Sequence, residues 1–225
     1  MLASAIVPTL DEAEALGGLL DHLASLPGAW EVVVADGGSR DGTRAIAAQR
    51  GVRVVDAPRG RAAQQNAGAA AASGDVLVFV HADSRLPATA HASLARALRD
   101  PAVAGGNFAL RFDGRDAFGR VLTAWYAVQR RLGVWYGDST IWVRPDVFAA
   151  LGGFPPLPIM EDYALVRALR RAGRTPCLPG PALTSGRRWR ALGAPRTVAS
   201  WVAIRWLFLA GVPPRRLAAL YRHVR

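Results

Sequence analysis

Two aspartates stand directly after apolar runs of the sequence. Residues 76–80 read Val-Leu-Val-Phe-Val and are followed by His-Ala-Asp83, and residues 31–35 read Glu-Val-Val-Val-Ala before Asp36. Apolar runs of this length that are rich in β-branched residues predict strands buried in a sheet. In an open parallel sheet, ligands bind beyond the carboxyl ends of the strands. We therefore expect Asp36 and Asp83 to lie at one edge of the sheet, in a nucleotide site.

Asp83 is the candidate metal ligand at this edge. Mg²⁺ and Mn²⁺ are commonly held by one or two carboxylates, and substrate phosphates and water complete the shell. One aspartate is therefore enough if a diphosphate supplies further oxygens, and we expect Mn²⁺ or Mg²⁺ as the cofactor. Three roles stay open for His81: a weak metal ligand, a hydrogen-bond partner of the diphosphate, and a structural histidine at the sheet edge. Ala82, which lies between these two residues, is included in the same nucleotide site.

A second group of candidate contacts lies between the first strand and the first helix. Pro8 and Thr9 end the strand, and the helix N-terminus behind them offers free N–H groups and the positive end of a dipole to an anion. Thr9-Leu-Asp-Glu12 matches a capping box that would open this helix. Glu12 is therefore either a helix cap or a residue of the site.

The run Gly60-Arg-Ala-Ala-Gln-Gln-Asn66 places a guanidinium and three amides in the early turns of a predicted helix. Arg61 is the candidate contact of a diphosphate. Asn66 would hold either a sugar or a neighbouring loop. A solvated helix face is the alternative for the whole run.

Strand-like and helix-like segments alternate along the chain. Strands are predicted at residues 3–8, 31–35, 52–56, 76–80, 104–112 and 140–143, and helices end near residues 26, 50, 72, 99, 131 and 172. This alternation with short connections predicts an α/β fold, with βαβ units that form a mostly parallel, Rossmann-like sheet flanked by helices.

The end of the chain is basic and apolar. Residues 163–225 contain 13 of the 28 arginines and no acid, whereas residues 1–162 carry 15 arginines and all 17 acids. Such a region favours anionic partners, and phospholipid head groups are one class of them. Residues 197–211 are apolar almost all round but shorter than the ~20 residues of a membrane-spanning helix. We expect helices packed on the sheet, with contact to a membrane interface as an addition to this packing.

The single cysteine, Cys177, and the early start of the first strand favour a cytoplasmic protein, at most peripheral to the inner face of the membrane. Nucleic acid is disfavoured as a partner because Asp36, Asp83 and Asp162 would repel its phosphates.

Four segments occur in an order that resembles the family 2 glycosyltransferases with the GT-A fold. They are Ile6-Val-Pro-Thr-Leu-Asp-Glu12, Val34-Ala-Asp-Gly-Gly-Ser-Arg-Asp-Gly-Thr43, Gly74-Asp-Val-Leu-Val-Phe-Val-His-Ala-Asp83 and Met160-Glu-Asp162. The resemblance covers roughly residues 3–175. It implies a catalytic domain at 1–175, with a nucleotide-binding half at 1–100 and an acceptor half at 101–175, and a basic helical extension at 176–225 packed on the same domain.

A narrower resemblance concerns a small bacterial subgroup associated with radical-SAM and selenoprotein-type domains, some of whose members are described as arsenosugar-biosynthesis glycosyltransferases. It is carried by His81-Ala-Asp-Ser84, Tyr136-Gly-Asp-Ser139, Gly152-Gly-Phe154 and Met160-Glu-Asp162. The acceptors of this subgroup are mostly unsettled, so the closer match gives little information on the substrate.

The family resemblance also implies roles for single residues. Asp36 would contact the uracil of a UDP-sugar, and Gly38 belongs to the same turn. Asp11 stands where the family usually has asparagine, and His81-Ala-Asp83 replaces the usual Asp-x-Asp. Both departures are close to the expected nucleotide.

An inverting transfer needs a base that removes the proton of the acceptor hydroxyl while its oxygen attacks the anomeric carbon. A carboxylate at a helix N-terminus stays ionised, so Asp162 is the candidate base and Glu161 a supporting residue. Asp138 is expected to contact the acceptor or the sugar. Trp135 is either part of an aromatic stacking wall or a core residue. The segment Ser185-Gly-Arg-Arg-Trp189 is similar to the Gln-x-x-Arg-Trp motif of processive synthases but lacks its glutamine.

Arg188 is a candidate diphosphate contact on a mobile loop, with Trp189 beside it. The resemblance thus implies an inverting transfer from a nucleotide-sugar donor, UDP-linked in the family's pattern, to an unknown hydroxyl or phosphate acceptor. Two alternatives stay open: a polyprenyl-phosphate glycosyltransferase acting at the membrane surface, and an inactive relative that binds the donor. A sugar-phosphate nucleotidyltransferase is disfavoured, because no Gly-rich basic loop follows the first strand.

Overall fold

The computed structural model of this chain describes residues 1–113, 117–185 and 194–221. Its strands are β1 (Leu2–Thr9), β2 (Ala29–Asp36), β3 (Arg53–Asp56), β4 (Val76–Phe79), β5 (Gly105–Phe112), β6 (Ile141–Val143) and β7 (Cys177–Thr184). Its helices are α1 (Ala13–Ser25), α2 (Thr43–Gln49), α3 (Arg61–Ala71), α4 (Ala90–Ala97), α5 (Ala117–Arg131), α6 (Pro145–Ala150), α7 (Glu161–Ala172), α9 (Ala194–Leu209) and α10 (Pro214–Leu220). A 3₁₀ turn, η1 (Gly137–Ser139), precedes β6.

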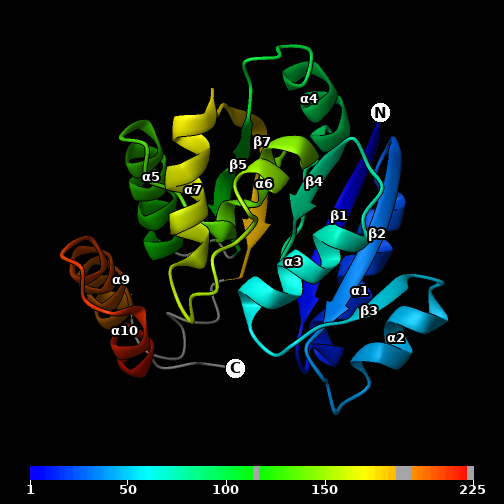
Figure 1. The fold of residues 1–225 in the computed structure, drawn as a ribbon, viewed down its shortest axis with the longest axis horizontal. Helices are drawn as coiled ribbons and strands as arrows, with labels where there is room; N and C mark the ends of the chain where they lie inside the picture. The colour runs from blue at the N-terminus through cyan, green and yellow to red at the C-terminus, as the bar shows by residue number, and fades with distance from the viewer. Residues whose placement is uncertain (114–116, 186–193, 222–225) are drawn as a thin grey trace.

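The described strands form one sheet in the order β3-β2-β1-β4-β6-β5-β7 (Figure 1). Six of them run in one direction, and β6 runs antiparallel to both of its neighbours, β4 and β5. The prediction of a mostly parallel sheet flanked by helices is therefore confirmed. The carboxyl ends of β1 and β4 lie next to each other in this order, so residues that follow these two strands meet at one edge of the sheet.

The two faces of the sheet carry separate apolar cores, because side chains along a strand alternate between the faces. Val76 and Val78 of β4 pack with buried leucines of α1 and α4, whereas Leu77 and Phe79 pack with residues of α3, α6 and α7. All four residues of β4 are buried. This two-sided burial explains the unbroken apolar run of its sequence.

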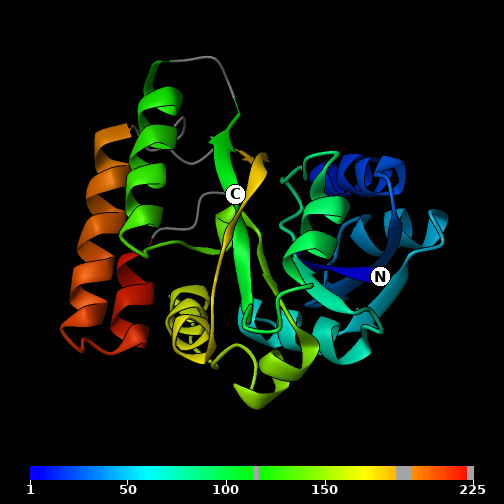
Figure 2. The same cartoon turned by 90° about the horizontal axis from the view of Figure 1, so that it is seen from above.

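The C-terminal helices α9 and α10 lie beside α5, on the side of the molecule away from α1 and β2 (Figures 1 and 2). Trp201 of α9 packs against Leu122 and Tyr126 of α5, and Ile204 of α9 packs against Met160 and Tyr163. These apolar contacts attach the basic C-terminal helices to α5 and to the N-terminus of α7. None of the described helices has both the length and the hydropathy needed to cross a membrane.

The structure differs from the predicted elements at several places, and helix α6 and the turn η1 are among the elements that were not predicted. The capping box is wrong: Thr9 belongs to β1, and the N-terminus of α1 is capped from another part of the chain, by Thr43 Oγ1 on the N–H of Glu12 and by Asp41 on the N–H of Ala13. Strand β7 was not predicted, because Pro179 and Pro181 interrupt its pattern. These prolines are tolerated because β7 is the last strand of the sheet.

Candidate active site

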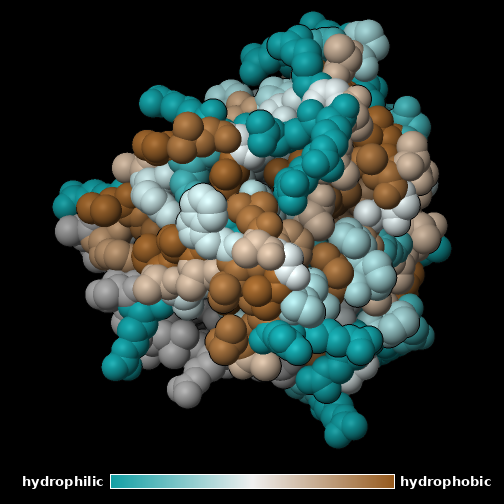
Figure 3. Space-filling model, turned by 60° about the vertical axis from the view of Figure 1, so that its left-hand side comes forward, coloured by the Kyte–Doolittle hydropathy of each residue, from teal (hydrophilic) through white to brown (hydrophobic). Residues whose placement is uncertain are grey.

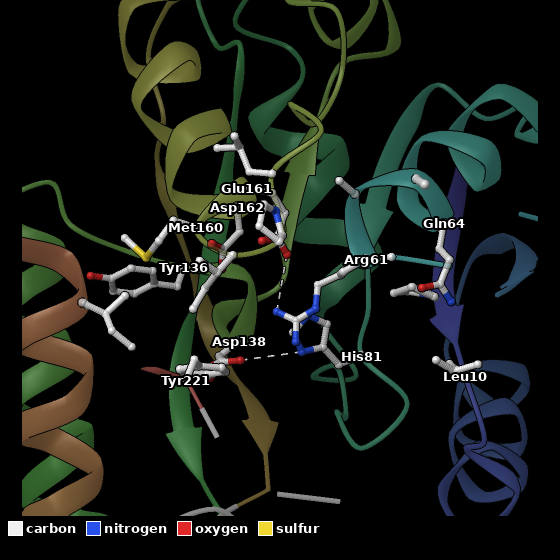
Figure 4. A pocket seen from close by; sticks show the side chains of 18 of the residues that line it. Leu10, Arg61, Gln64, His81, Tyr136, Asp138, Met160, Glu161, Asp162 and Tyr221 are labelled. Carbon is white, nitrogen blue, oxygen red and sulfur yellow. Dashed lines mark ion pairs between the residues drawn. The ribbon is translucent and has the colours of Figure 1, made fainter. Parts of the chain in front are cut away.

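A cavity of about 1090 Å³ opens at the carboxyl ends of β1 and β4. Pro8 of β1 and the segment His81-Ala-Asp83, which follows β4, line one side. The first turn of α3, the loop at residues 156–160, the N-terminus of α7 and the helices α5, α9 and α10 contribute further lining. Figure 4 shows how the charged side chains of these elements point toward one another in the cavity.

Arg61 and Glu161 connect two opposite sides of this cavity. Arg61 is the first residue of α3 and Glu161 the first residue of α7, and a distance of 3.6 Å separates Arg61 Nη1 from Glu161 Oε1 (Figure 4). The Glu161 side chain is only 4% exposed, whereas that of Arg61 is 50% exposed. The guanidinium is thus accessible to an anion that enters the cavity.

The environment of Glu161 changes its protonation. Burial is the largest cause and, together with the neighbouring carboxylate of Asp162, it raises the pKa of Glu161 to about 7, although the Arg61 guanidinium acts in the opposite direction. Glu161 therefore gains and loses a proton near neutral pH. A carboxyl group with such a pKa is suited to proton exchange during a reaction.

Asp162 is held in one orientation by backbone donors. Its Oδ2 accepts a hydrogen bond of 2.8 Å from the N–H of Gly137 in η1, and its Oδ1 accepts one of 2.7 Å from the N–H of Tyr163. Met160, the residue before α7, has a left-handed backbone with φ of 66°. Because this conformation is costly for a residue with a side chain, it marks a turn that the surrounding structure holds in place. The turn places both acids of α7 in the cavity.

His81 and Asp138 form a second pair in the same cavity. His81 Nδ1 lies 3.6 Å from Asp138 Oδ1 (Figure 4). Burial, followed by the nearby Arg61, lowers the pKa of His81. Burial also raises the pKa of Asp138, although His81 and Arg61 oppose this effect. Both pairs lie in one cavity, where the carboxyl groups of Glu161, Asp162 and Asp138 all interact electrostatically with the Arg61 guanidinium.

The model of the family described as "Glycosyl transferase family 2" matches residues 4–152. This chain belongs to glycosyl transferase family 2. A search of curated proteins found no match.

Solved structures similar to this family 2 chain share its fold. The mannosyltransferase PcManGT from Pyrobaculum calidifontis, in complex with GDP-Man and Mn²⁺, has a TM-score of 0.66 at 20% identity over 81% of this chain. S. aureus TarS 1-349 in complex with UDP-GlcNAc has a TM-score of 0.67 at 17% identity over 83% of the chain. Glucosyl-3-phosphoglycerate synthase from Mycobacterium tuberculosis, in complex with Mn²⁺, UDP and glucosyl-3-phosphoglycerate, has a TM-score of 0.63 at 21% identity over 94% of the chain.

The present chain spans 56%, 59% and 80% of the lengths of these three proteins, respectively. The likeness shows the fold alone, and it confirms the GT-A architecture.

Most of the residues predicted for the site of this family 2 chain lie in the cavity lining. They are Pro8, Glu12, Arg61, Asn66, His81, Ala82, Asp83, Asp138, Glu161 and Asp162. Of the two partners expected for Asn66, a sugar or a neighbouring loop, the structure shows the loop. The side-chain amide of Asn66 donates to the carbonyl of Phe154 at 2.9 Å and accepts from the N–H of Phe154 at 2.8 Å. Asn66 therefore fastens the loop after α6 to α3. Glu12 makes no side-chain cap of α1.

Asp36 lies at the same edge of the sheet but outside the cavity lining. Its buried carboxylate accepts hydrogen bonds from the N–H groups of Gly38 and Ser39, from the hydroxyls of Ser39 and Thr9, and from Arg44. Hydrogen bonding to the charged form lowers the pKa of Asp36 despite its burial. Asp36 thus stabilises its own turn, and its contact with a base stays a prediction.

Thr9, Asp11 and Gly38 surround this turn and are likewise outside the lining. Thr9 is paired in register with Asp36, and the carboxylate of Asp11 accepts from the N–H of Arg40 at 2.8 Å. Gln64, which the sequence analysis did not single out, connects the turn with the cavity. Its side-chain amide donates to the carbonyls of Thr9 and Ala35, and the residue lines the cavity.

Trp135 is corrected to a core residue. Its side chain is 1% exposed and packs in the cluster that contains Phe79 and Leu165, with the guanidinium of Arg130 5.1 Å from its ring centroid. The indole therefore contacts the interior and not an acceptor. Three other aromatic residues, Trp125, Tyr126 and Tyr136, line the cavity. The predicted contacts Arg188 and Trp189 lie outside the described residues.

Residues of α9 and α10 form a cavity wall that the sequence analysis did not predict in detail. Trp201 and Arg205 come from α9, Arg215 comes from α10, and Tyr221 follows α10. Arg205 donates to Gln129 Oε1 of α5, which fixes α9 to α5 at this position. The signal in the sequence was the mixture of tryptophans and arginines in a region without acids.

The metal site predicted at Asp83 and His81 needs further ligand oxygens from a bound nucleotide diphosphate. Among the described residues, no group of three or more His, Cys, Asp or Glu side chains is arranged to hold a metal ion. Asp83 and His81 nevertheless share the cavity with the Arg61 guanidinium. One carboxylate with oxygens of a diphosphate is a suitable donor set for Mn²⁺ or Mg²⁺. The residues present fit a metal that enters together with a nucleotide.

Proposed function

We propose that this chain is an inverting glycosyltransferase that moves a sugar from a nucleotide-sugar to a hydroxyl or phosphate acceptor. The observation that carries the proposal is the position of Asp162. Its carboxylate is oriented by the N–H of Gly137 in the cavity that also contains Asp83 and the exposed guanidinium of Arg61. A base, an anion contact and a candidate metal ligand thus surround one space beyond the strand ends.

The reaction would use these groups in one displacement. Asp162 accepts the proton of the acceptor hydroxyl while the acceptor oxygen forms a bond to the anomeric carbon. The bond from this carbon to the diphosphate oxygen breaks on the opposite side, and the nucleoside diphosphate leaves. Arg61 stabilises the negative charge that accumulates on the diphosphate in the transition state. A bound Mn²⁺ or Mg²⁺, held by Asp83 and aided by His81, would supply further stabilisation of this charge.

Glu161 and Asp138 have supporting roles in this proposal. Glu161 lies beside Asp162 and holds Arg61, so its charge state adjusts the position of the guanidinium. Asp138 approaches His81 and lines the side of the cavity between β4 and the helical wall. We propose that it contacts the acceptor or the transferred sugar.

A uridine nucleotide is the proposed donor. The support is the resemblance to the family, which implies that Asp36 at the end of β2 contacts uracil; Asp36 lies in register with Thr9, the last residue of β1. A thermal-shift panel of nucleoside diphosphates and their sugars, with and without Mn²⁺, would test this preference. Stabilisation by guanosine and not by uridine nucleotides would refute it.

The substitution Asp162→Asn tests the proposed base. The amide cannot accept the proton, so turnover should fall by about 10²–10⁴-fold while the donor still binds. Turnover is measured as release of nucleoside diphosphate, with hydrolysis of the donor as the basal reaction. Full activity of this variant would remove Asp162 from its role. Nucleotide binding by the unmodified chain without hydrolysis or transfer would instead identify an inactive, donor-binding relative.

A further inference from the structure

Large apolar side chains are exposed on one side of the molecule. Among the described residues, eight such side chains are exposed, and all except Met1 belong to α5, α9, α10 or the residue after α5. They are Val121, Val128, Leu132, Trp206, Leu207, Leu209 and Leu220, with exposed fractions between 37% and 74%. We call the exposed side of these three helices the α5–α9–α10 face.

The spacing of these side chains shows that two helices turn an apolar stripe outward. Val121, Val128 and Leu132 are separated by seven and four residues, so they share one side of α5. On α9, Trp206 and Leu207 follow the exposed Ala199 and Ala203. Helix α9 is apolar almost all round, and helices of this kind are normally covered on all sides. Figure 3 shows apolar side chains at the surface of this side of the molecule, beside hydrophilic ones.

The charges of the same face are of one sign. The sequences of α5, α9 and α10 contain seven arginines and no aspartate or glutamate. Arg120 and Arg131 on α5, Arg196 on α9 and Arg216 on α10 are all exposed. An apolar helix face flanked by arginines has the composition of segments that lie in the interface of an anionic membrane.

We propose that the α5–α9–α10 face docks on the surface of an anionic lipid bilayer. The apolar side chains would enter the boundary between head groups and acyl chains, and the arginines would contact the lipid phosphates. A second copy of this chain is a poorer occupant, because two such faces would bring arginines against arginines. Nucleic acid is also a poorer occupant, because leucine, valine and tryptophan at the centre of the face match no phosphate backbone.

The α5–α9–α10 face and the cavity share the helices α9 and α10. Trp201 and Arg205 line the cavity from α9, and Arg215 lines it from α10. The same two helices therefore contribute to the cavity wall with one side and to the docking face with the other. Docking on a bilayer would bring the proposed acceptor side of the cavity next to lipid. This proposal goes beyond the proposed transfer and is tested without a donor.

Co-sedimentation of the full chain with vesicles measures the docking. Vesicles of phosphatidylcholine alone are compared with vesicles that also contain phosphatidylglycerol, at low and high salt. We expect binding to the anionic vesicles that weakens as salt increases, and little binding to phosphatidylcholine alone. The triple substitution Val128→Ser, Leu132→Ser and Trp206→Ser removes apolar contacts and should reduce the bound fraction while circular dichroism and nucleotide binding stay unchanged.

A matched pair of charge variants localises the interaction. Arg131→Gln with Arg196→Gln removes two charges from the face and should weaken binding by roughly tenfold or more. Arg96→Gln with Arg99→Gln removes two exposed charges near α4 and should have little effect. Equal losses in both pairs would overturn the proposal, as would failure of the full chain to bind anionic vesicles at low salt. Concentration-dependent dimerisation that the triple substitution abolishes, with no effect on vesicle binding, would overturn it in favour of a second copy.

Discussion

The substitution Glu161→Gln should make the chain more stable at alkaline pH and leave it nearly unchanged at acidic pH. The pKa of Glu161 rises from 4.5 to about 7 because the folded chain buries the carboxyl beside Asp162. Since the pKa is raised by folding, the contribution of the protonated group is fully present below about pH 4.5 and is lost as the pH increases through about 7. One pKa unit corresponds to about 1.4 kcal/mol, so burying the ionised carboxylate costs about 3 kcal/mol at high pH.

Glutamine resembles the protonated carboxyl and avoids this cost. The free energy of unfolding of the variant, relative to that of the unmodified chain, should therefore increase by about 3 kcal/mol between about pH 4 and about pH 8. Urea denaturation followed by circular dichroism measures both free energies. The control Glu14→Gln changes an exposed acid of α1 and should alter the stability by less than about 0.5 kcal/mol at both pH values. A difference that is the same at both pH values for Glu161→Gln would refute the reasoning.

Three further substitutions test the remaining contacts of the site. Arg61→Met removes the guanidinium that faces the cavity and should weaken the binding of UDP by about tenfold or more, which calorimetry measures; unchanged affinity would remove Arg61 from the anion site. Asp83→Ala should abolish the increase in UDP affinity that Mn²⁺ produces, and an increase that persists would exclude Asp83 as the ligand. Asn66→Ala removes both bonds to Phe154 and should lower the free energy of unfolding by about 1–3 kcal/mol in urea; an unchanged midpoint would contradict the fastening role.

The centre of the sheet was predictable because β4 is buried on both faces and β1 is almost completely buried. The run at β4 needs apolar residues at every position, and a continuous apolar run is a strong signal. Strand β7 needs fewer apolar residues than β4, because it is the last strand of the sheet. It also contains Pro179 and Pro181. Its pairing with β5 depends on contacts between residues about 70 positions apart, which no local pattern reveals.

The candidate site was predictable where its residues end strands or begin helices. Asp83 and Asp162 are examples, because the topology of the sheet brings such positions to one edge. The orientation of side chains was not predictable in the same way. Asp36 has a favourable position, yet its oxygens face the backbone of its own turn, and the indole of Trp135 faces the core. The wall formed by α9 depends on tertiary packing against α5, so only its composition was visible in the sequence.

The wall that α9 and α10 contribute also determines when the cavity is completed during synthesis of the chain. Translation proceeds from the N-terminus, so β1, β4 and the acids of α7 are made before residues 194–221 exist. Until that last stretch leaves the ribosome and folds against α5, the cavity lacks Trp201, Arg205 and Arg215. A nascent chain that ends before α9 therefore lacks this side of the cavity, although the residues of all seven strands precede it.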